Sequence, residues 1–412
     1  MTEPATPADQ YDVIVIGAGP AGCAAAAFLK RAGHEVCVLE KTRFPRFVIG
    51  ESLLPRCNDL LDEAGLLDAV KRQGYLEKHG ALFLKEGECC RFDFAEQHTP
   101  GARFTWQVPR DHFDQVLARE VESLGVPVLF EQTVTSARVG DRPQVLVCGA
   151  EGEERRIDCR FIIDASGYGR VLPRLLNLDR PSDLPARRAL FAHLAGDRRP
   201  RGREEGLIWI VQSAASAWSW VIPFSNGRTS FGVVGPAEFF QSLAAAPADL
   251  KGRLEEVIQM DAATAARFQG AEIALTPRTI EAYSVGVSQL HGEGFCLVGN
   301  ATEFLDPVFS SGVTLALESA LLAARALDRQ LKGESVDWQA QFVAPLKAEI
   351  DCFRTYVKAW YAGDLSRLFF SKTALPRYRK MVCSVLAGHA WDLSNPLVKN
   401  HERKLRQLIQ LV

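Results

Sequence analysis

The sequence lacks a long apolar run, an excess of charge of either sign and a paired cysteine motif. Its 48 basic and 50 acidic residues leave a net charge of −2, so no broad field attracts nucleic acid or an anionic membrane. No apolar stretch approaches the length of a membrane span. The ten cysteines contain no CxxC motif, which argues against a disulfide framework and a zinc site. These absences predict a protein with no nucleic-acid partner, no membrane span and no bound metal.

The first ten residues also lack the features of a secretory signal. They are polar and slightly acidic, with neither a basic start nor an apolar core. Together with the unpaired cysteines they predict a cytoplasmic setting. The 412 residues are 47% hydrophobic and 24% charged, which is typical of a folded protein of two or three domains.

What the sequence does have begins with a nucleotide-binding pattern. Residues 11–16 form a nearly continuous apolar run, as expected of a parallel strand buried on both faces. A glycine-rich turn, residues 17–22, leads into an alanine-rich helix over residues 21–32. A second apolar strand, residues 35–39, ends at Glu40. The order of strand, turn, helix, strand and acidic residue predicts a complete dinucleotide-binding unit.

Each part of this unit has a physical task. Gly17 permits a tight turn, Gly19 lets a pyrophosphate approach the backbone, and Gly22 allows the helix to pack closely on the strand. The helix N-terminus presents unpaired N–H groups to the phosphates. The Glu40 carboxylate is expected to accept hydrogen bonds from the adenosine ribose, which argues against a 2′-phosphate. This unit alone leaves NAD and FAD open.

Two later strands narrow the choice of cofactor. Residues 160–167 and 294–302 are apolar strands that run into small-residue turns, and a long helix follows residues 304–312. In these stretches the sequence resembles the FAD-dependent hydroxylases, halogenases and reductases that share the glutathione-reductase type of FAD fold. Where such enzymes often carry Gly-Asp, this chain has Gly299-Asn300, whose amide can still bond the ribityl hydroxyls. The resemblance implies an FAD-binding protein.

The remaining patterns predict the architecture. Residues 110–121 form an amphipathic helix, whose leading Arg110 either contacts FAD, as in the resembling class, or caps the helix in solvent. Short alternating strands from about 190 to 279, with a hairpin signal at Asn226-Gly227, predict a second, antiparallel sheet. After about residue 335 the chain is expected to be helical, packed over a substrate cavity or against another subunit.

We therefore expect an α/β protein of the α+β two-domain kind: a Rossmann-like FAD-binding domain with a parallel sheet, an antiparallel-sheet substrate domain and a helical C-terminal region. The predicted boundaries are 1–80, 106–178 and 286–334 for the FAD-binding domain, 81–105 and 179–285 for the substrate domain, and 335–412 for the helical region.

A tryptophan pattern then points to a narrower family. On a strand Trp218, Trp220 and Ile222 share one face, and Pro223 is expected to end the ladder. This Trp-x-Trp-x-Ile-Pro pattern resembles the flavin-dependent halogenases, in which the tryptophans lie near the flavin and separate it from the organic substrate. A strand of this kind in an unrelated protein is usually core.

Three further stretches match that family. Phe304, Pro307, Ser310 and Gly312 reproduce its Phe-x-x-Pro-x-x-Ser-x-Gly element, whose backbone N–H groups around Ser311 and Gly312 border the halide and the flavin. Lys78 falls where halogenases place their catalytic lysine, although a lone lysine is usually a solvated surface charge. Residues 50–52, Gly-Glu-Ser, look like the family's turn near the isoalloxazine ring.

The resemblance implies a reaction in which reduced flavin, oxygen and halide produce a hypohalous acid that Lys78 receives. Burial beside apolar walls would lower the pKa of the amine and favour its reactive neutral form. The tryptophan-modifying branch carries a glutamate directly before the serine of the element, and this chain has Phe309 there. This predicts an already activated ring, a phenol, resorcinol or pyrrole, rather than free tryptophan.

The site residues expected on this basis fall into four groups. The catalytic pair is Lys78 and Ser310, and the halide contacts are Ser311 and Gly312. The substrate chamber is formed by Trp218, Trp220, Ile222, Pro223 and Phe309. The FAD contacts are Gly17, Gly19, Pro20, Ala21, Gly22, Glu40, Lys41, Gly50, Glu51, Ser52, Arg110, Asp164, Gly167, Asn300, Pro307 and Gly312.

Several alternatives stay open. The runner-up activity is a flavin monooxygenase or oxidase of the same fold, followed by a dehydrogenase resembling the geranylgeranyl reductases and by a flavin-binding protein without turnover. No second glycine-rich nucleotide fingerprint is present in the sequence, which favours a separate flavin reductase as partner. The choice of chloride or bromide, carrier tethering of the substrate and the oligomeric state are left open.

Overall fold

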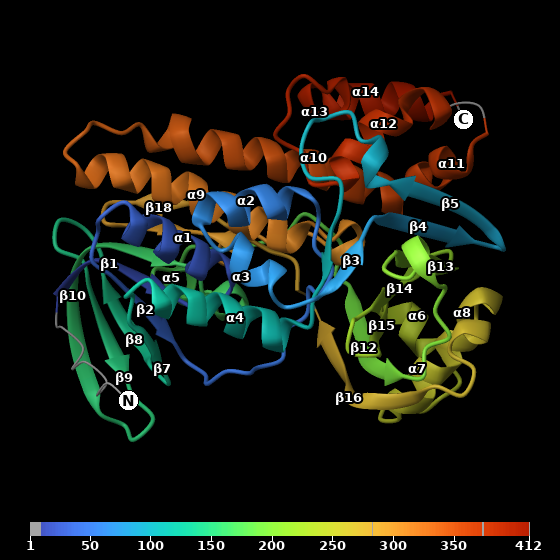
Figure 1. The fold of residues 1–412 in the computed structure, drawn as a ribbon, viewed down its shortest axis with the longest axis horizontal. Helices are drawn as coiled ribbons and strands as arrows, with labels where there is room; N and C mark the ends of the chain where they lie inside the picture. The colour runs from blue at the N-terminus through green and yellow to red at the C-terminus, as the bar shows by residue number, and fades with distance from the viewer. Residues whose placement is uncertain (1–9, 282, 373–374, 412) are drawn as a thin grey trace.

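A computed structural model describes residues 10–281, 283–372 and 375–411. The polar segment that argued against a secretory signal lies outside the described residues except for Gln10. In Figure 1 the larger sheet lies on the left, the smaller sheet on the lower right, and the C-terminal helices above them. No described helix has the length and apolar character needed to cross a membrane. All ten cysteines are free thiols.

The larger sheet is built around β1 (Gln10–Ile16). Strand β1 pairs in parallel with β10 (Glu154–Asp164) on one side and β2 (Val36–Glu40) on the other. Its apolar run is continuous because both faces are buried: Val13 and Val15 pack in one core cluster, and Ile14 and Ile16 pack in another. The sheet extends to β19 (Phe295–Leu297), β18 (His291–Gly292), β7 (Val128–Phe130), β9 (Gln144–Cys148) and β8 (Thr133–Arg138).

The parallel register brings several strand ends to one edge. Ile16 lies opposite Leu39 of β2 and Asp164 of β10. Helix α1 (Pro20–Arg31) starts at this edge and α4 (Arg110–Ser123) packs beside it. Ligands of open α/β sheets bind at the carboxyl ends of the strands, so this edge is where a nucleotide site is expected.

The smaller sheet has the order β16-β12-β15-β14-β13-β4-β5. Its strands are β16 (Glu272–Glu281), β12 (Arg188–Ala195), β15 (Arg228–Gly235), β14 (Ala217–Pro223), β13 (Ile208–Ala214), β4 (Gly80–Lys85) and β5 (Glu88–Asp93). One face is covered by α6 (Ala237–Gln241), α7 (Leu250–Gln259) and α8 (Ala262–Arg267). The other face is turned toward the larger sheet.

The expected antiparallel sheet is present, with one parallel pair in it: β13 pairs in parallel with β4, a strand from far earlier in the chain. Pro223 is the last residue of β14, as expected, and its pair with Thr229 is the last of the ladder with β15. The Phe224 N–H then donates to the Arg228 carbonyl at 2.8 Å. The pairing of β14 with β13 reaches only Val221, so no neighbouring carbonyl there needs the N–H that proline lacks.

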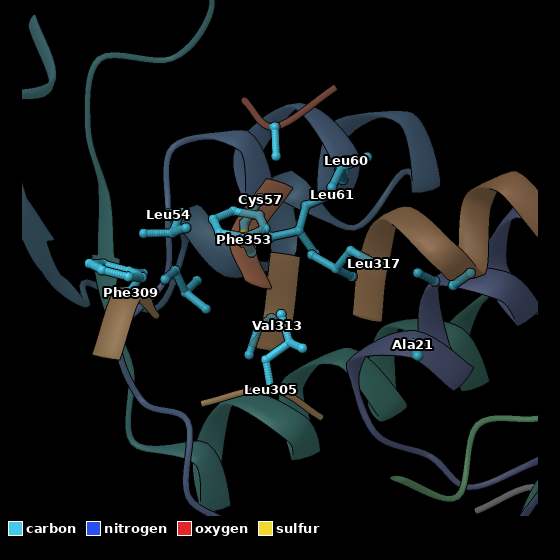
Figure 2. Close-up of a cluster of buried hydrophobic side chains, with 14 of the residues drawn as sticks. Ala21, Leu54, Cys57, Leu60, Leu61, Leu305, Phe309, Val313, Leu317 and Phe353 are labelled. Carbon is cyan, nitrogen blue, oxygen red and sulfur yellow. The ribbon is translucent and has the colours of Figure 1, made fainter. Parts of the chain in front are cut away.

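The C-terminal region is helical, as expected. Helix α9 (Ser311–Leu331) is followed by a π-helical turn (Gln339–Val343), α10 (Ala344–Tyr361), α11 (Asp364–Phe370), α12 (Leu375–Leu386), α13 (Pro396–Lys399) and α14 (His401–Ile409). Five side chains of this region form a buried apolar stripe: Phe342, Leu346, Ile350, Phe353 and Val357. Figure 2 shows Phe353 among side chains of α2 (Arg56–Ala64) and α9, including Cys57, Leu61 and Leu317. This packing fixes α10 beside α2 and α9.

Short elements connect these layers. They are α3 (Leu67–Lys71), α5 (Val171–Leu175), the pair β3 (Leu76–Lys78) and β6 (Thr105–Gln107), and the pair β11 (Asp179–Pro181) and β17 (Val285–Val287).

Candidate active site

A cavity of about 700 Å³ lies between the carboxyl edge of the larger sheet and the smaller sheet. We call it the central cavity. Its size is that of a typical ligand or cofactor site. Most of the predicted site residues line it: Gly17, Gly19, Pro20, Ala21, Glu40, Lys41, Gly50, Glu51, Ser52, Arg110, Gly167, Trp218, Trp220, Ile222, Asn300, Pro307, Ser310 and Gly312. Gly22, Lys78, Asp164, Pro223, Phe309 and Ser311 do not belong to its lining.

The glycine turn forms one end of the cavity. Gly17 has a φ of +101°, which L side chains rarely adopt, and a Cβ on Gly22 would lie 1.9 Å from the Gly17 carbonyl oxygen. A Cβ on Gly19 would meet only the Arg46 guanidinium at 3.7 Å, so the space before Gly19 is open to the cavity. Helix α1 begins there without a side-chain cap. The free N–H groups and open space fit a pyrophosphate.

Glu40 ends β2 at the cavity, with its side chain largely engaged by the protein. One carboxylate oxygen accepts the Ala18 N–H at 3.0 Å, and the other accepts the Thr42 N–H at 3.1 Å and hydroxyl at 2.7 Å. These bonds hold the carboxylate at the cavity wall, where carboxylate oxygens have lone pairs left for a ribose hydroxyl.

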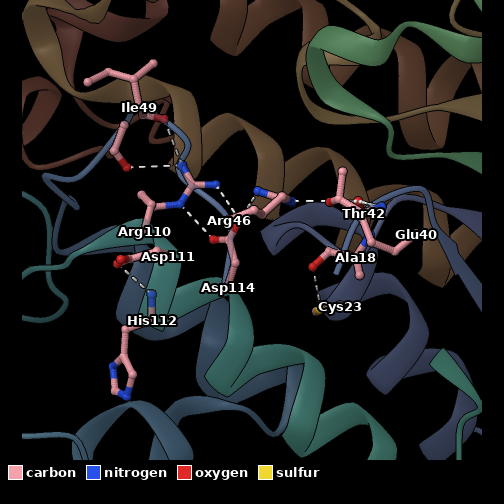
Figure 3. Close-up of polar contacts among 11 residues, drawn as sticks. Ala18, Cys23, Glu40, Thr42, Arg46, Ile49, Arg110, Asp111, His112 and Asp114 are labelled. Atoms are coloured by element: carbon pink, nitrogen blue, oxygen red, sulfur yellow. Dashed lines mark hydrogen bonds and ion pairs between the residues drawn. The ribbon is translucent and has the colours of Figure 1, made fainter. Parts of the chain in front are cut away.

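A buried ion-pair chain holds the segment that covers the cavity (Figure 3). Arg110 donates from Nε to Asp114 Oδ1 at 2.7 Å and from Nη1 to the carbonyls of Ile49 at 3.1 Å and Gly50 at 3.2 Å. Arg46 reaches the same carboxylate from above, with Nη1 donating to Asp114 Oδ2 at 3.0 Å. Arg110 is 7% exposed, so it is not a solvated helix cap. The chain fixes residues 46–50 over the cavity.

Glu51 carries a buried oxygen with no partner. Its Oε1 lies 2.6 Å from His193 Nε2 of β12, while among the described residues no group bonds its Oε2. Glu51 is 1% exposed and lines the central cavity. Native structures rarely leave a buried carboxylate oxygen unpaired, so this atom fits a donor on a bound cofactor. The residues present at both ends of the cavity therefore fit FAD.

Asp164 is used by the fold. It is fully buried, and its two oxygens accept the N–H groups of Ser166 at 2.9 Å and Leu172 at 2.6 Å. Burial raises the pKa of its carboxyl. These bonds shape the turn that presents Gly167 to the cavity, and Asp164 itself stays behind that turn.

Lys78 is buried directly behind the cavity wall. Its Nζ donates to the hydroxyl of Ser52 at 2.8 Å and to the carbonyl of Leu53 at 2.7 Å, and it lies 5.5 Å from the centre of the Phe94 ring. Only 1% of the side chain surface is exposed. Burial lowers the pKa of the amine from 10.5 to about 7. A lysine that is half neutral at pH 7 can act as a nucleophile.

Trp218 and Trp220 of β14 form one wall of the central cavity, which we call the tryptophan wall. Trp218, Trp220 and Ile222 share the cavity face, as the alternation predicted. Trp220 lies opposite Gly232 of β15, and a Cβ on Gly232 would come within 2.2 Å of the indole ring. The Trp220 N–H donates to the Ser230 hydroxyl at 3.0 Å. The large ring fits only because its cross-strand partner has no side chain.

The turn from residue 304 to 312 forms another part of the cavity lining. Ser310 has a φ of 57° and precedes α9, whose N-terminus has no side-chain cap. Pro307, Ser310 and Gly312 line the cavity. Phe309 instead lies in the core, with its ring edge-on to Tyr356 at 6.4 Å and Trp360 at 6.2 Å. Pro223, Phe309 and Ser311 thus surround the chamber without forming its surface.

Several residues of the site were missed by sequence reasoning. Asp114, His193 and Gly232 act through partners that are distant in sequence, and a single sequence does not give such pairs. Asp306 stands inside the recognised Phe-x-x-Pro element, so its carboxylate was available as a signal. Tyr283 carries no local signal, although it lines the cavity.

Comparison with known proteins agrees with this geometry. The FAD binding domain family matches residues 10–340. The chain is 34% identical over 331 residues to a tryptophan 2-halogenase of Chondromyces crocatus, covering 78% of this chain and 62% of that relative's length. It is 31% identical over 350 residues to the flavin-dependent halogenase armH3 of Armillaria mellea, covering 80% of this chain and 69% of that relative's length.

Another relative acts on a carrier-bound ring. The chain is 29% identical over 339 residues to a 1H-pyrrole-2-carbonyl peptidyl-carrier-protein brominase of Pseudoalteromonas luteoviolacea strain 2ta16, covering 81% of this chain and 80% of the relative.

Two solved structures share the whole architecture. A flavoprotein/dehydrogenase from Cytophaga hutchinsonii superimposes with a TM-score of 0.94 at 47% identity, covering 98% of both chains. The flavin-dependent brominase Bmp2 superimposes with a TM-score of 0.82 at 25% identity, covering 97% of this chain and 98% of that one.

Proposed function

Since this chain belongs to the flavin-dependent halogenase family of FAD-dependent oxidoreductases, we propose that it halogenates an electron-rich aromatic ring. The co-substrates are halide and oxygen, and the FAD is reduced by a separate flavin reductase. Residues 1–80, 106–178 and 286–334 bind FAD in this proposal, residues 81–105 and 179–285 build the substrate wall, and residues 335–412 support it.

The observation that carries the proposal is the buried Lys78 amine behind Ser52. When bound, FAD supplies the oxidising chemistry that converts halide into hypohalous acid. The neutral amine of Lys78 either hydrogen-bonds that acid or exchanges an N–H proton for the halogen, with release of water. Its pKa of about 7 leaves much of the amine unprotonated near neutral pH.

The remaining residues hold reactants apart or in place. Trp218 and Trp220 form an apolar wall that excludes water from the path between the cofactor and the ring to be halogenated. The uncapped N-terminus of α9 at Ser311 and Gly312 offers N–H groups to a halide ion. Ser310 positions that terminus through its left-handed backbone, and Glu51 Oε2 accepts a bond from the flavin.

The substrate class follows from Phe309. The tryptophan-modifying branch carries a glutamate at this place, and the phenyl ring here is packed in the core, where it supplies no base. A phenol, resorcinol or pyrrole needs less help because its ring is already electron-rich. The carrier-protein brominase among the relatives is the reason to offer the ring both free and tethered to a carrier protein.

Turnover with defined components tests this proposal. The FAD-loaded protein, a flavin reductase, NADH, oxygen and bromide are incubated with resorcinol, and brominated product is measured by mass spectrometry. We expect product that depends on bromide and on the reductase. Lys78→Met should abolish it while FAD affinity is retained, and Lys251→Met, on an exposed side chain, should not affect it. Equal product from Lys78→Met and wild type would refute the lysine role.

A second candidate has one observation in its favour, the likeness at 47% identity to a flavoprotein/dehydrogenase. A flavin monooxygenase, oxidase or dehydrogenase would use the same fold without halide. Hydroxylated product that does not depend on bromide would favour the monooxygenase. Fast flavin reduction by NAD(P)H without a reductase would favour a hydroxylase or reductase.

A further inference from the structure

A chain of hydrogen bonds joins four separate parts of the sequence at the tryptophan wall. The Trp218 indole N–H donates to the Tyr361 hydroxyl at 3.1 Å, and that hydroxyl donates to Asp306 Oδ2 at 2.7 Å. The Tyr283 hydroxyl donates to the same oxygen at 3.2 Å, and the other oxygen, Oδ1, accepts the Val308 N–H at 3.0 Å. Both ends of the chain, Trp218 and Tyr283, line the central cavity.

The members of this chain come from three different elements. Trp218 belongs to β14, Asp306 to the turn before α9, and Tyr361 is the last residue of α10. Arg187 strengthens the junction: its guanidinium lies 4.0 Å from the centre of the Tyr361 ring, and its Nη1 donates to the Ser216 carbonyl at 3.0 Å, just before β14. The C-terminal helices are thus tied to the substrate wall by polar bonds in addition to packing.

We propose that Asp306 and Tyr361 are positioning residues that fix the indole of Trp218 at the substrate wall, and that the C-terminal helical region thereby sets the affinity for the aromatic substrate. The substrate part rests on the proposed function. The positioning of Trp218 does not, because it follows from the bonds themselves.

The direction of the bonds is what gives Asp306 this task. An ionised carboxylate only accepts, so the Tyr361 proton must point at Asp306 and a hydroxyl lone pair must face the Trp218 N–H. A protonated Asp306 can donate to the Tyr361 oxygen instead, so the Tyr361 proton no longer has to point at Asp306 and can turn toward the Trp218 N–H, where it opposes that bond. The groups that face the carboxyl are Tyr283, Tyr361, Arg187 and, more remotely, Tyr168. Burial raises the pKa of Asp306 to about 6, so the change falls in a measurable range.

The chain itself offers a matched control. Tyr356 lies on α10, one and a half turns before Tyr361, and is fully buried. Among the described residues its hydroxyl has no hydrogen-bond partner. Tyr356→Phe and Tyr361→Phe therefore remove the same atom from two tyrosines of one helix, and only the second change interrupts the chain.

Fluorine NMR of the FAD-loaded protein labelled with 5-fluorotryptophan tests the positioning. The Trp218 signal is assigned by its loss in Trp218→Phe. We expect Tyr361→Phe and Asp306→Asn to shift or broaden this signal, and Tyr356→Phe to leave it unchanged. In wild type the signal should move with a midpoint near pH 6, and Asp306→Asn should remove that pH dependence. A Trp218 signal that ignores Tyr361→Phe overturns the proposal, whether or not the protein halogenates any compound.

Turnover kinetics test the consequence for the substrate. Loss of one buried hydrogen bond predicts that Tyr361→Phe raises KM for resorcinol about fivefold, with kcat and FAD affinity close to wild type. In a Trp218→Phe background the same change should have no further effect, because the indole N–H through which it acts is gone. Additive effects of the two changes would overturn the assignment to Trp218. Absence of halogenated product from wild type would refute the proposed function, and the NMR result would still decide the positioning.

Discussion

Replacing Lys78 by methionine removes the titrating amine at the centre of the proposed chemistry. The amine is 1% exposed, and burial lowers its pKa from 10.5 to about 7. In the folded protein about three quarters of the amine is then neutral at pH 7.5, against about one part in a thousand for a lysine in water. The unfolded chain binds this proton more tightly than the folded chain between pH 7 and 10.5, so folding becomes more favourable as pH rises through that window.

The size of this effect can be worked out from the two pKa values. From about pH 7 to pH 9 the folded amine has lost its proton while the unfolded one keeps it. A difference of one bound proton over about two pH units raises the free energy of unfolding by about 3 kcal/mol. The free energy of unfolding of wild type minus that of Lys78→Met should therefore rise by about 3 kcal/mol from pH 6 to pH 9. Other titrating groups cancel in this difference because both proteins share them.

The assay is guanidinium unfolding at several pH values with saturating FAD, followed by circular dichroism. Lys251→Met is the control, since the Lys251 ammonium group stays in water. A difference between wild type and Lys78→Met that is constant from pH 6 to pH 9 would refute the lowered pKa. The same pKa predicts that kcat/KM for halogenation rises with pH, with a midpoint near pH 7. A flat pH profile would show that the neutral amine of Lys78 takes no part in the reaction.

Five further substitutions test the cavity. Gly22→Ala places a Cβ 1.9 Å from a backbone carbonyl oxygen and should prevent stable folding, as measured by thermal unfolding. Gly19→Ala should keep the stability of the apoprotein and weaken FAD binding more than about tenfold, as measured by flavin fluorescence. Glu51→Gln replaces the carboxylate, which only accepts hydrogen bonds, by an amide with one acceptor and one donor group. It should weaken FAD binding about tenfold in the same fluorescence titration. Unchanged binding would show that Oε2 faces no flavin donor. Gly232→Ala forces the Trp220 ring from its place, so it should lower the free energy of unfolding by about 1 to 3 kcal/mol and remove most of the halogenated product. Ser230→Ala removes only the hydrogen bond to Trp220 and should lower the free energy of unfolding by about 1 kcal/mol.

The parts of the fold that could be predicted from the sequence are those with a local cause. The continuous apolar run at residues 11–16, the glycine turn and the Asn226-Gly227 hairpin each owe their shape to neighbouring residues, and the structure has them within a residue or two of the expected bounds. The parallel pairing of β13 with β4 could not be foreseen, because it joins segments more than 120 residues apart and leaves no local pattern in either.

The site divides in the same way. The face of β14 on which Trp218 and Trp220 lie follows from the alternation of side chains along one strand. The lowered pKa of Lys78 follows from its burial, which its apolar neighbours in the sequence suggested. Pro223 ends β14 as predicted, at a place where β13 no longer extends and where the N–H that proline lacks is not needed. Glu51 was predicted from the sequence to be a cofactor residue, whereas its partner His193 lies on a strand of the other sheet and could be found only from the fold.

Phe309 shows most clearly why a motif position is not yet a place in a site. Its absence of charge suggested an apolar chamber wall, but the side chain turns away from the cavity and packs against Tyr356 and Trp360 of α10. Three residues earlier, Asp306 keeps a buried carboxylate that two tyrosines hold, one of them from the same helix. The turn that in the tryptophan-modifying branch presents a carboxylate to the reaction is here anchored at both residues to the C-terminal helix. A change in that helix should therefore alter the tryptophan wall before it alters FAD binding, since within the described part of the chain no hydrogen bond joins the glycine turn or the Arg110 chain to α10.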